Sequence, residues 1–277
     1  DIMKIRSSIC SETGRIRTEN QDRLFADDQL GLFIVADGIG GGPHGAVAAE
    51  IVVQVLPTLM RRWLREASPG DNGKTSNRPL SKLEDQLKSD LCQVSEQLRE
   101  DSQGVPGLDG MGSTAAVLAF AGNRIITGHL GDSRIYRLRE GQLSQVTVDH
   151  SVAQVLMSTG ELTEDDAVHH PSCTRLTRFV GMPSPTLPTT TTHLLQAGDR
   201  FLLCTDGVSG ALPVSLLASL LNDGEAETDV AERLVRSAVE YCGSDNATAV
   251  VVDVSGDVAG SVWSSDQSTD SRDGVTD

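Results

Sequence analysis

The chain carries at residues 32–38 the stretch LFIVADG, an apolar run of strand length that stops abruptly at an acid and a glycine. FLLCTDG at residues 201–207 repeats this pattern. Short runs of apolar residues without polar alternation are typical of strands buried on both faces. Further strands are predicted at residues 114–120, 124–129, 134–139 and 247–254. These segments predict a core dominated by β-sheet.

Helical periodicity is clear at residues 80–98, where leucine and valine recur every three or four positions and line one face. Residues 46–64 and 229–241 behave similarly, and residues 151–161 are predicted to include a short helix. Long helices among strands, without strict alternation, favour an α+β fold over a doubly wound sheet. The stretch at 68–79, rich in Gly, Pro, Asn and Ser, predicts a loop.

Composition and charge limit the possible functions. The chain has 277 residues and a net charge of -16, from 39 acidic and 23 basic residues, which disfavours nucleic acid and anionic membranes and suits cations. No apolar run approaches the roughly 18 residues needed to span a bilayer, and no secretory segment is evident, so we expect a soluble cytoplasmic protein. One domain followed by a flexible acidic tail at residues 256–277 is predicted, because the tail has too few apolar groups to offset its ordering.

Several aspartates stand at the ends of predicted strands or in tight turns. They are Asp37, Asp132, Asp206 and Asp245, and Asp22 follows a polar segment. A carboxylate near a core must be paired, hydrated or bound to a cation. Each has an ordinary alternative, because Asp-Gly forms turns and Asp-Asn can cap a helix. Their joint occurrence, without clusters of histidine or cysteine, favours an oxygen-ligand site for magnesium or manganese.

The glycine-rich stretch DGIGGG at residues 37–42 is a weak candidate for a nucleotide-binding loop. No GxxxxGK[ST] motif occurs, and the GxGxxG spacing is incomplete. The glycines instead indicate a close approach of the backbone to a metal, with the carbonyl of Gly38 available as a ligand.

Seven short motifs occur in the order found in metal-dependent protein phosphatases of type 2C. They are RTENQD at 17–22, VADGIGG at 35–41, GST at 112–114, GDSR at 131–134, DHS at 149–151, CTDG at 204–207 and DNAT at 245–248. The chain resembles the compact bacterial branch of this family over residues 5–254. The resemblance implies a central β-sandwich of two antiparallel sheets flanked by helices in four αββα layers. It also implies a catalytic domain at residues 1–255 with a variable flap at about 151–192.

The resemblance further implies a centre of two manganese or magnesium ions. Asp37 would bridge both ions, and Asp206 and Asp245 would complete the ligands of the first. The carbonyl of Gly38 would serve the second ion, with Asp22 in or near its shell. Two such ions about 3.5 to 4 Å apart lower the pKa of a bridging water toward about 7, so hydroxide becomes available at neutral pH.

Other positions matching the family carry expectations of their own. Arg17 would bind the substrate phosphate through a bidentate fork that a lysine could not reproduce. Asp132 together with Asp206 would match the ligands of a third, weaker ion. Two departures stand out: Gln21 occupies the place of a glutamate in many bacterial relatives, and Ile39 the place of a histidine proposed as general acid in animal relatives. The general acid is therefore unassigned.

The implied activity is hydrolysis of phosphoserine and phosphothreonine in proteins, which reverses serine/threonine kinase signalling, with Arg17 and Asp37 as catalytic residues. The expected partners are phosphorylated proteins and a cognate kinase pathway, and the expected state is a monomer. One alternative is a catalytically weakened phosphoprotein-binding module on the same fold, supported only by Gln21. Another is a hydrolase of small phosphate esters.

A few other polar residues are predicted to be structural. Ser113 and Thr114 stand at the start of a predicted strand, where a packing role is favoured over catalysis. His129 is an isolated histidine, predicted to be a hydrogen-bonded structural residue. His150 fits a family motif but has no ligand role that the sequence assigns.

Overall fold

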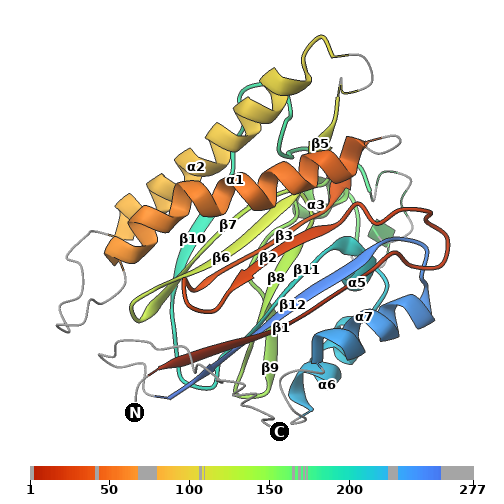
Figure 1. Ribbon diagram of the computed structural model, residues 1–277. Coiled ribbons are helices and arrows are strands. Elements are labelled where there is room, and N and C mark those ends of the chain that lie inside the picture. Colours follow the sequence, from red (N-terminus) through yellow and green to blue (C-terminus); the bar gives the residue numbers. More distant parts are fainter. Residues whose placement is uncertain are drawn as a thin grey trace, which may run out of the picture.

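The computed structural model describes residues 3–40, 44–67, 80–105, 108, 110–163, 166–167, 170, 172, 174–223 and 230–256. These residues form two five-stranded antiparallel sheets packed face to face, with helices on both outer faces (Figure 1). The predicted αββα sandwich is confirmed. The loop predicted at residues 68–79 and almost all of the tail predicted at 256–277 lie outside the described residues.

The first sheet has the spatial order β10-β7-β6-β3-β2. Its strands are β2 (Arg23–Asp27), β3 (Leu32–Ala36), β6 (Ala115–Ala121), β7 (Arg124–Leu130) and β10 (Thr189–Leu194). Both β3 and β6 are buried throughout, as their unbroken apolar runs predict. The threonine-rich strand β10 lies at one edge and is half-buried.

The second sheet has the spatial order β1-β12-β11-β8-β9. Its strands are β1 (Lys4–Glu12), β8 (Arg134–Arg139), β9 (Gln142–Gln145), β11 (Arg200–Cys204) and β12 (Ala247–Ser255). β1 pairs with β12 along its whole length, from Lys4 opposite Ser255 to Glu12 opposite Ala247. A separate two-stranded ladder joins β4 (Gly38–Ile39) to β5 (Gly112–Ser113).

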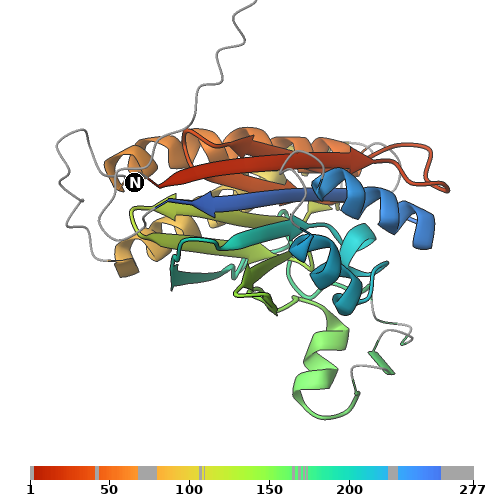
Figure 2. The ribbon, with the colours of Figure 1, turned by 90° about the horizontal axis from the view of Figure 1, so that it is seen from below.

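Four helices form the outer layers of the sandwich. The first sheet is covered by α1 (His44–Ala67) and α2 (Leu80–Ser102), and the second by α6 (Val214–Asn222) and α7 (Val230–Tyr241), as the view in Figure 2 also shows. Two shorter helices, α3 (Val152–Ser158) and α5 (Asp206–Ser209), lie in the connections. Within the described ranges, no helix is long and apolar enough to cross a membrane.

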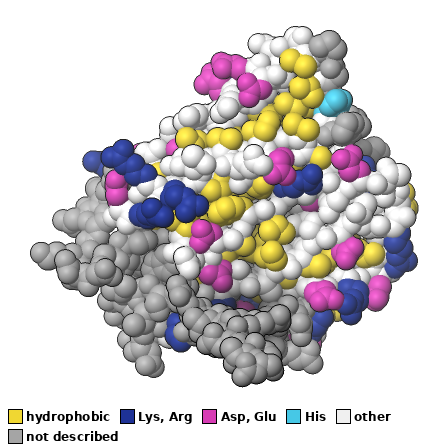
Figure 3. All heavy atoms as spheres, viewed as in Figure 1, with side chains coloured by type: hydrophobic (Ala, Val, Ile, Leu, Met, Phe, Trp, Pro, Cys, Tyr) yellow, Lys and Arg dark blue, Asp and Glu magenta, His cyan; other side chains and the backbone are white. Residues whose placement is uncertain are grey.

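Three hydrophobic clusters join the four layers. The cluster between the sheets includes Phe33, Phe120 and Phe201, whose rings meet edge to face at centroid distances of 6.0 and 6.1 Å. The other two clusters lie between each sheet and its helices. On the outside of the helical layer, hydrophobic side chains form a band along α1 and α2 with charged groups around it (Figure 3). The three clusters thus pack the two sheets and their helices into a support for the loops at the ends of the sandwich.

Candidate functional site

The candidate site lies where several strands begin or end together. In the first sheet, β3 and β7 end where β6 begins, because Val35 pairs with Ala116 and Ala115 pairs with Leu130. In the second sheet, β11 ends where β12 begins. The acidic residues adjoining these strand ends therefore meet at one end of the sandwich: Asp37, Asp132, Asp206 and Asp245.

These residues surround a cavity of about 420 Å³. It is lined by Arg17, Gln21, Asp37, Gly38, Ile39, Gly40, Thr114, Asp132, Thr174, Leu176, Phe179, Asp206, Asp245 and Asn246. Every residue predicted for the site lines the cavity except Asp22. Side chains from positions more than 200 residues apart in the sequence thus meet as the metal hypothesis requires.

Asp22 lies next to the cavity lining, buried with only 3% of its surface exposed. The hydroxyl of Thr205 donates a hydrogen bond to its Oδ2 at 2.8 Å. Its Oδ1, like the Oδ1 of Asp206, is buried and receives no hydrogen bond from any described residue. A buried carboxylate oxygen without a donor is costly, and a hard divalent cation would satisfy it.

Burial and neighbouring carboxylates raise the pKa of several acids in and beside the cavity. For Asp37 the pKa lies well above its usual value because of burial and then the negative charges of Asp22, Asp206, Asp132 and Asp245. Burial also raises the pKa of Asp22 and of Asp132, each to about 7, with the charge of Asp206 adding to both. A cluster of buried acids that resists ionisation is the setting in which bound cations relieve the repulsion.

The acids surround the cavity rather than forming a compact triad. Among the described residues, no group of three or more acidic, histidine or cysteine side chains is already drawn together as ligands of one ion. Mutual repulsion between carboxylates opposes such an approach. The donor set, all oxygen and all anionic apart from the Gly38 carbonyl, nevertheless fits magnesium or manganese rather than zinc.

The backbone of Asp37 is fixed by hydroxyl groups. The Oγ1 of Thr114 accepts a hydrogen bond from the Asp37 N–H at 2.9 Å, and the hydroxyl of Ser113 donates to the Asp37 carbonyl at 3.0 Å. Thr114 in turn shares a hydrogen bond of 2.6 Å with Ser133. The sequence favoured a packing role for Ser113 and Thr114. In the structure, their hydroxyl groups hydrogen-bond the backbone of Asp37, and Thr114 also lines the cavity.

Gly38 is required by helix packing. A Cβ atom at this position would lie 2.2 Å from the backbone carbonyl of Gly45, at the start of α1. The sequence predicts that this glycine allows the backbone to approach a metal. In the structure, the close neighbour of Gly38 is the first turn of α1. In the same way, a Cβ at Gly207 would lie 1.8 Å from the Asn246 carbonyl oxygen. The backbone that follows Asp206 therefore lies directly against Asn246, the residue before β12.

Arg17 lies at the rim of the cavity with its side chain 55% exposed, and its Nη2 donates to Asp245 at 2.8 Å. The loop that carries Arg17 is held by Asn246. The side-chain oxygen of Asn246 accepts from the backbone N–H of Gln21 at 2.9 Å, and its amide donates to the backbone oxygens of residues 13 and 19. The DNAT motif at 245–248 contains Asn246, but the motif alone does not predict that Asn246 anchors the loop of Arg17.

The predicted flap contributes three lining residues that the sequence did not single out. They are Thr174, Leu176 and Phe179. Backbone bonds hold this segment against the preceding chain, because the N–H of Thr177 donates to His150 O at 2.8 Å and that of Val152 to residue 175. The short helix predicted within 151–161 is confirmed as α3, capped by the Ser151 side chain. Leu176 and Phe179 give the acidic cavity an apolar wall.

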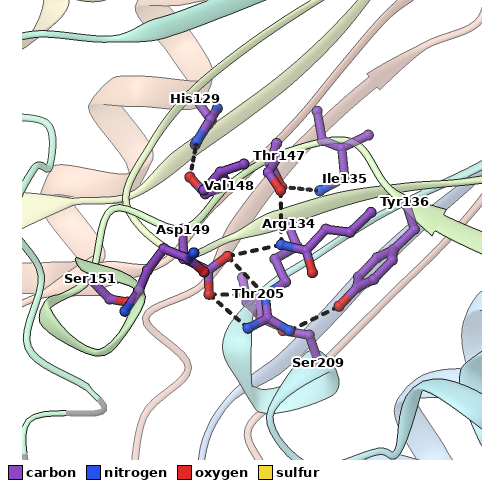
Figure 4. Close-up of polar contacts among 12 residues, drawn as sticks. His129, Arg134, Ile135, Tyr136, Thr147, Val148, Asp149, Ser151, Thr205 and Ser209 are labelled. Atoms are coloured by element: carbon purple, nitrogen blue, oxygen red, sulfur yellow. Dashed lines mark hydrogen bonds and ion pairs between the residues drawn. The ribbon is translucent and has the colours of Figure 1, made fainter. Parts of the chain in front are cut away.

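The chain preceding the flap is fixed by Arg134, whose guanidinium forks around Asp149 with contacts of 2.7 to 3.1 Å (Figure 4). Next to this pair, the rings of His129 and His150 stack with centroids 4.3 Å apart. The His129 ring bonds the Val148 carbonyl oxygen at 2.8 Å. Burial, then His129 and a nearby arginine, lower the pKa of His150 to about 3. His129 is therefore a hydrogen-bonded structural residue, as predicted.

A four-layer sandwich with this acidic cavity at one end is the arrangement of the metal-dependent protein phosphatases. A model of one such family, described as Protein phosphatase 2C, matches residues 15–249. The chain belongs to this family.

Among curated relatives, the serine/threonine protein phosphatase PstP of Mycobacterium tuberculosis is 33% identical over 250 residues, which is 90% of this chain and 45% of PstP. The serine/threonine phosphatase stp of Listeria welshimeri is 30% identical over 246 residues, 88% of this chain and 93% of stp. The solved catalytic domain of PstP in complex with two manganese ions is 32% identical, with a TM-score of 0.74 and coverage of 92% of this chain and 100% of that one. The chain therefore spans less than half of PstP and nearly all of the Listeria protein.

Proposed function

We propose that this chain is a metal-dependent protein phosphatase that hydrolyses phosphoserine and phosphothreonine in other proteins. One observation carries the proposal: buried oxygens of Asp22 and Asp206 have no hydrogen-bond donor among the described residues, in and beside a cavity lined by four carboxylates. The relatives named as serine/threonine phosphatases, and the manganese found in PstP, support the same reading.

Two divalent ions fit the residues present. Asp37, Asp206 and Asp245 would hold the first, while Asp37 and the Gly38 carbonyl would hold the second, with Asp22 beside it. When bound, such a pair of ions supplies an activated water and offsets charge on the phosphoryl oxygens. Asp132 and Asp206 would hold a third ion. The protein's own contribution is to hold the backbone of Asp37 through the hydroxyls of Ser113 and Thr114, which would orient this ligand before the ions bind.

Binding of the phosphate group falls to Arg17. Its guanidinium is exposed at the rim and bonds Asp245 through Nη2. Its other N–H groups, which bond no described residue, could turn toward a phosphate. Ile39 lines the cavity, but its side chain has no ionisable proton, so it cannot protonate the leaving group. The apolar wall of Leu176 and Phe179 limits how far water reaches around a bound substrate.

The proposed domain comprises residues 1–255 with the flap at about 151–192. We also propose phosphorylated proteins as its substrates and an opposing serine/threonine kinase as its functional partner. The monomeric state and the cytoplasmic location stay predictions.

The test uses Asp37→Asn and Asp206→Asn, with Asp101→Asn on the exposed end of α2 as a matched control. Turnover of p-nitrophenyl phosphate and of a phosphothreonine peptide is measured with manganese and with EDTA, and folding is followed by circular dichroism. We expect the two cavity variants to fold normally and to lose manganese-dependent turnover by about 10² or more, because each removes a metal ligand. Near-normal turnover in both would show that the carboxylates do not hold the metals. Absence of turnover in the unsubstituted chain would favour a binding module.

A further inference from the structure

Strand β8 carries three arginines, and two of them have a carboxylate of their own. Arg134 forks around Asp149 at its start, and Arg139 forks around the fully buried Asp199 at its end, with both contacts at 2.6 Å. Arg137, between them, has no side-chain partner among the described residues, and its Nε is buried without a hydrogen bond. A buried guanidinium nitrogen without an acceptor is as unusual as a buried carboxylate oxygen without a donor.

The side chain of Arg137 lies on the inner face of the sandwich. Side chains alternate along a strand. Ile135 belongs to the cluster between the sheets, whereas Tyr136 and Leu138 pack on the helical side, so Arg137 shares the inner face with Ile135. On the facing sheet, His193 of β10 pairs with Ile125, which belongs to the same inner cluster. Arg137 and His193 therefore lie on the faces that the two sheets turn toward each other.

Contacts at both ends of β8 and β10 determine which residues of the two strands lie at the same height in the sandwich. Near the start, His150, which directly follows the Asp149 bound by Arg134, bonds the Thr189 hydroxyl at 2.9 Å. Near the end, Arg139 Nη2 donates to the Leu194 carbonyl at 2.9 Å. Between these two contacts, β8 runs five residues from Arg134 to Arg139, and β10 runs five residues from Thr189 to Leu194. Arg137 is consequently level with the region of β10 around residues 191–193.

A short chain of hydrogen-bonded polar side chains lies on β7 and β10, on the side that faces Arg137. The Thr191 hydroxyl bonds Thr127 at 2.7 Å and the His193 Nε2 at 3.0 Å. After burial, the charge of Arg137 is the main cause that lowers the pKa of His193, Arg139 acts in the same direction, and Glu84 alone opposes them. In a chain of net charge -16, the surroundings of Arg137 and His193 are a place where an anion would be attracted.

We propose that Arg137 and the neighbouring Thr191 and His193 form a binding site for a small oxyanion, a phosphate or carboxylate group that presents two oxygens to the guanidinium edge. Such an anion would give Arg137 the bidentate partner that Asp149 and Asp199 give its neighbours. It would also bridge β8 and β10, the edge strand that begins within the last residues of the predicted flap. The site is separate from the metal cavity, whose lining includes none of these three residues.

The experiment follows the His193 ring by NMR in the full chain loaded with magnesium. Its ring signals are assigned by comparison with His193→Gln. Titrations with sodium phosphate, sodium acetate and sodium chloride are made at equal ionic strength. We expect phosphate or acetate to shift the His193 signals saturably and to raise the pKa of His193, because the bound anion offsets the field of Arg137. Whichever of the two acts identifies the class of oxyanion. Equal shifts with chloride, or no saturable shift, would overturn the proposal.

Three variants separate a specific site from general charge. Arg137→Gln should remove the anion response and raise the pKa of His193 in the absence of anion. Arg137→Lys keeps the charge without the fork, so it should retain a depressed His193 pKa but weaken anion binding about tenfold. The matched control is Arg124→Gln, which removes the same charge from β7 opposite Leu194 and should leave the response unchanged. An unchanged response in both Arg137 variants would contradict the assignment.

Discussion

Replacing Asp22 with asparagine should stabilise the metal-free chain at neutral pH and leave its stability almost unchanged in acid. Asp22 is 3% exposed, and burial with the charges of Asp206 and Asp245 raises its pKa from 3.8 to about 7. At about 1.36 kcal/mol per pH unit, this difference corresponds to about 4 kcal/mol of unfavourable free energy once the group is ionised. Asparagine removes the charge and keeps an oxygen that can accept from Thr205.

The direction follows from proton binding. The folded chain holds the Asp22 proton more tightly than the unfolded chain, so ionisation costs nothing below a pH of about 4. As pH rises from about 4 to about 7, the unfolded state releases the proton first and the folded state loses stability relative to the variant. Above about pH 7 the difference is constant. We therefore expect Asp22→Asn to gain about 2 to 4 kcal/mol over the unsubstituted chain at pH 8 and almost nothing at pH 4.

The assay is urea unfolding, followed by tryptophan fluorescence, with EDTA at several pH values between 4 and 8. The measurement at pH 4 is an internal control for any packing effect of the amide. Saturating manganese should reverse the ranking, because the cation stabilises the carboxylate and not the amide. A stability difference that is independent of pH, or that favours the aspartate in EDTA at pH 8, would refute the repulsion argument.

Two further predictions concern single contacts. Arg17→Ala should raise the KM for p-nitrophenyl phosphate by about tenfold with a smaller change in kcat, because it removes a charge-assisted contact made before the transition state; an unchanged KM in steady-state kinetics would reassign that arginine. Trp63→Phe should lower the free energy of unfolding by about 1 to 3 kcal/mol, because the buried Asp90 loses the 2.8 Å bond from the indole N–H. Urea unfolding measures this cost, which should shrink when Asp90→Asn is also present; an equal cost in both backgrounds would assign it to packing alone.

The apolar strands were predictable because burial on both faces leaves an unbroken hydrophobic run. β3 and β8 were predicted with their observed bounds, and α1, α2 and α7 within a few residues. β10 was not, because its sequence TTTTHL has no apolar alternation and it becomes a strand only through pairing with β7. β1 was also missed, since its apolar positions are separated by Ser and Cys and its register depends on a strand more than 200 residues away. The local sequence pattern does not show which distant segments will pair as strands.

The acids of the site were predictable from their position at strand ends, where a turn explains one aspartate but not four. The residues that orient them were less accessible. The hydroxyl of Thr114 bonds the Asp37 N–H across 77 positions of sequence, and Asn246 reaches the loop before β2 across 225. The lining residues Leu176 and Phe179 are ordinary apolar residues in a polar segment. The bridges from Ser151 to Leu176 and from Ser113 to Val180 bring them to the cavity. Such roles depend on three-dimensional proximity, for which the chain offers no local signal.

The pairing of β1 with β12 also determines where any attached polypeptide leaves the domain. Lys4 and Ser255 are directly opposite each other, whereas β12 begins at Ala247, next to the acidic cavity. Nine residues of strand at about 3.3 Å each separate these two ends by roughly 25 to 30 Å. An affinity tag, a fusion partner or a surface tether joined at either strand end would therefore emerge from one shared corner, far from the acidic cavity. Immobilising the protein at that corner should leave the opening of the acidic cavity unobstructed.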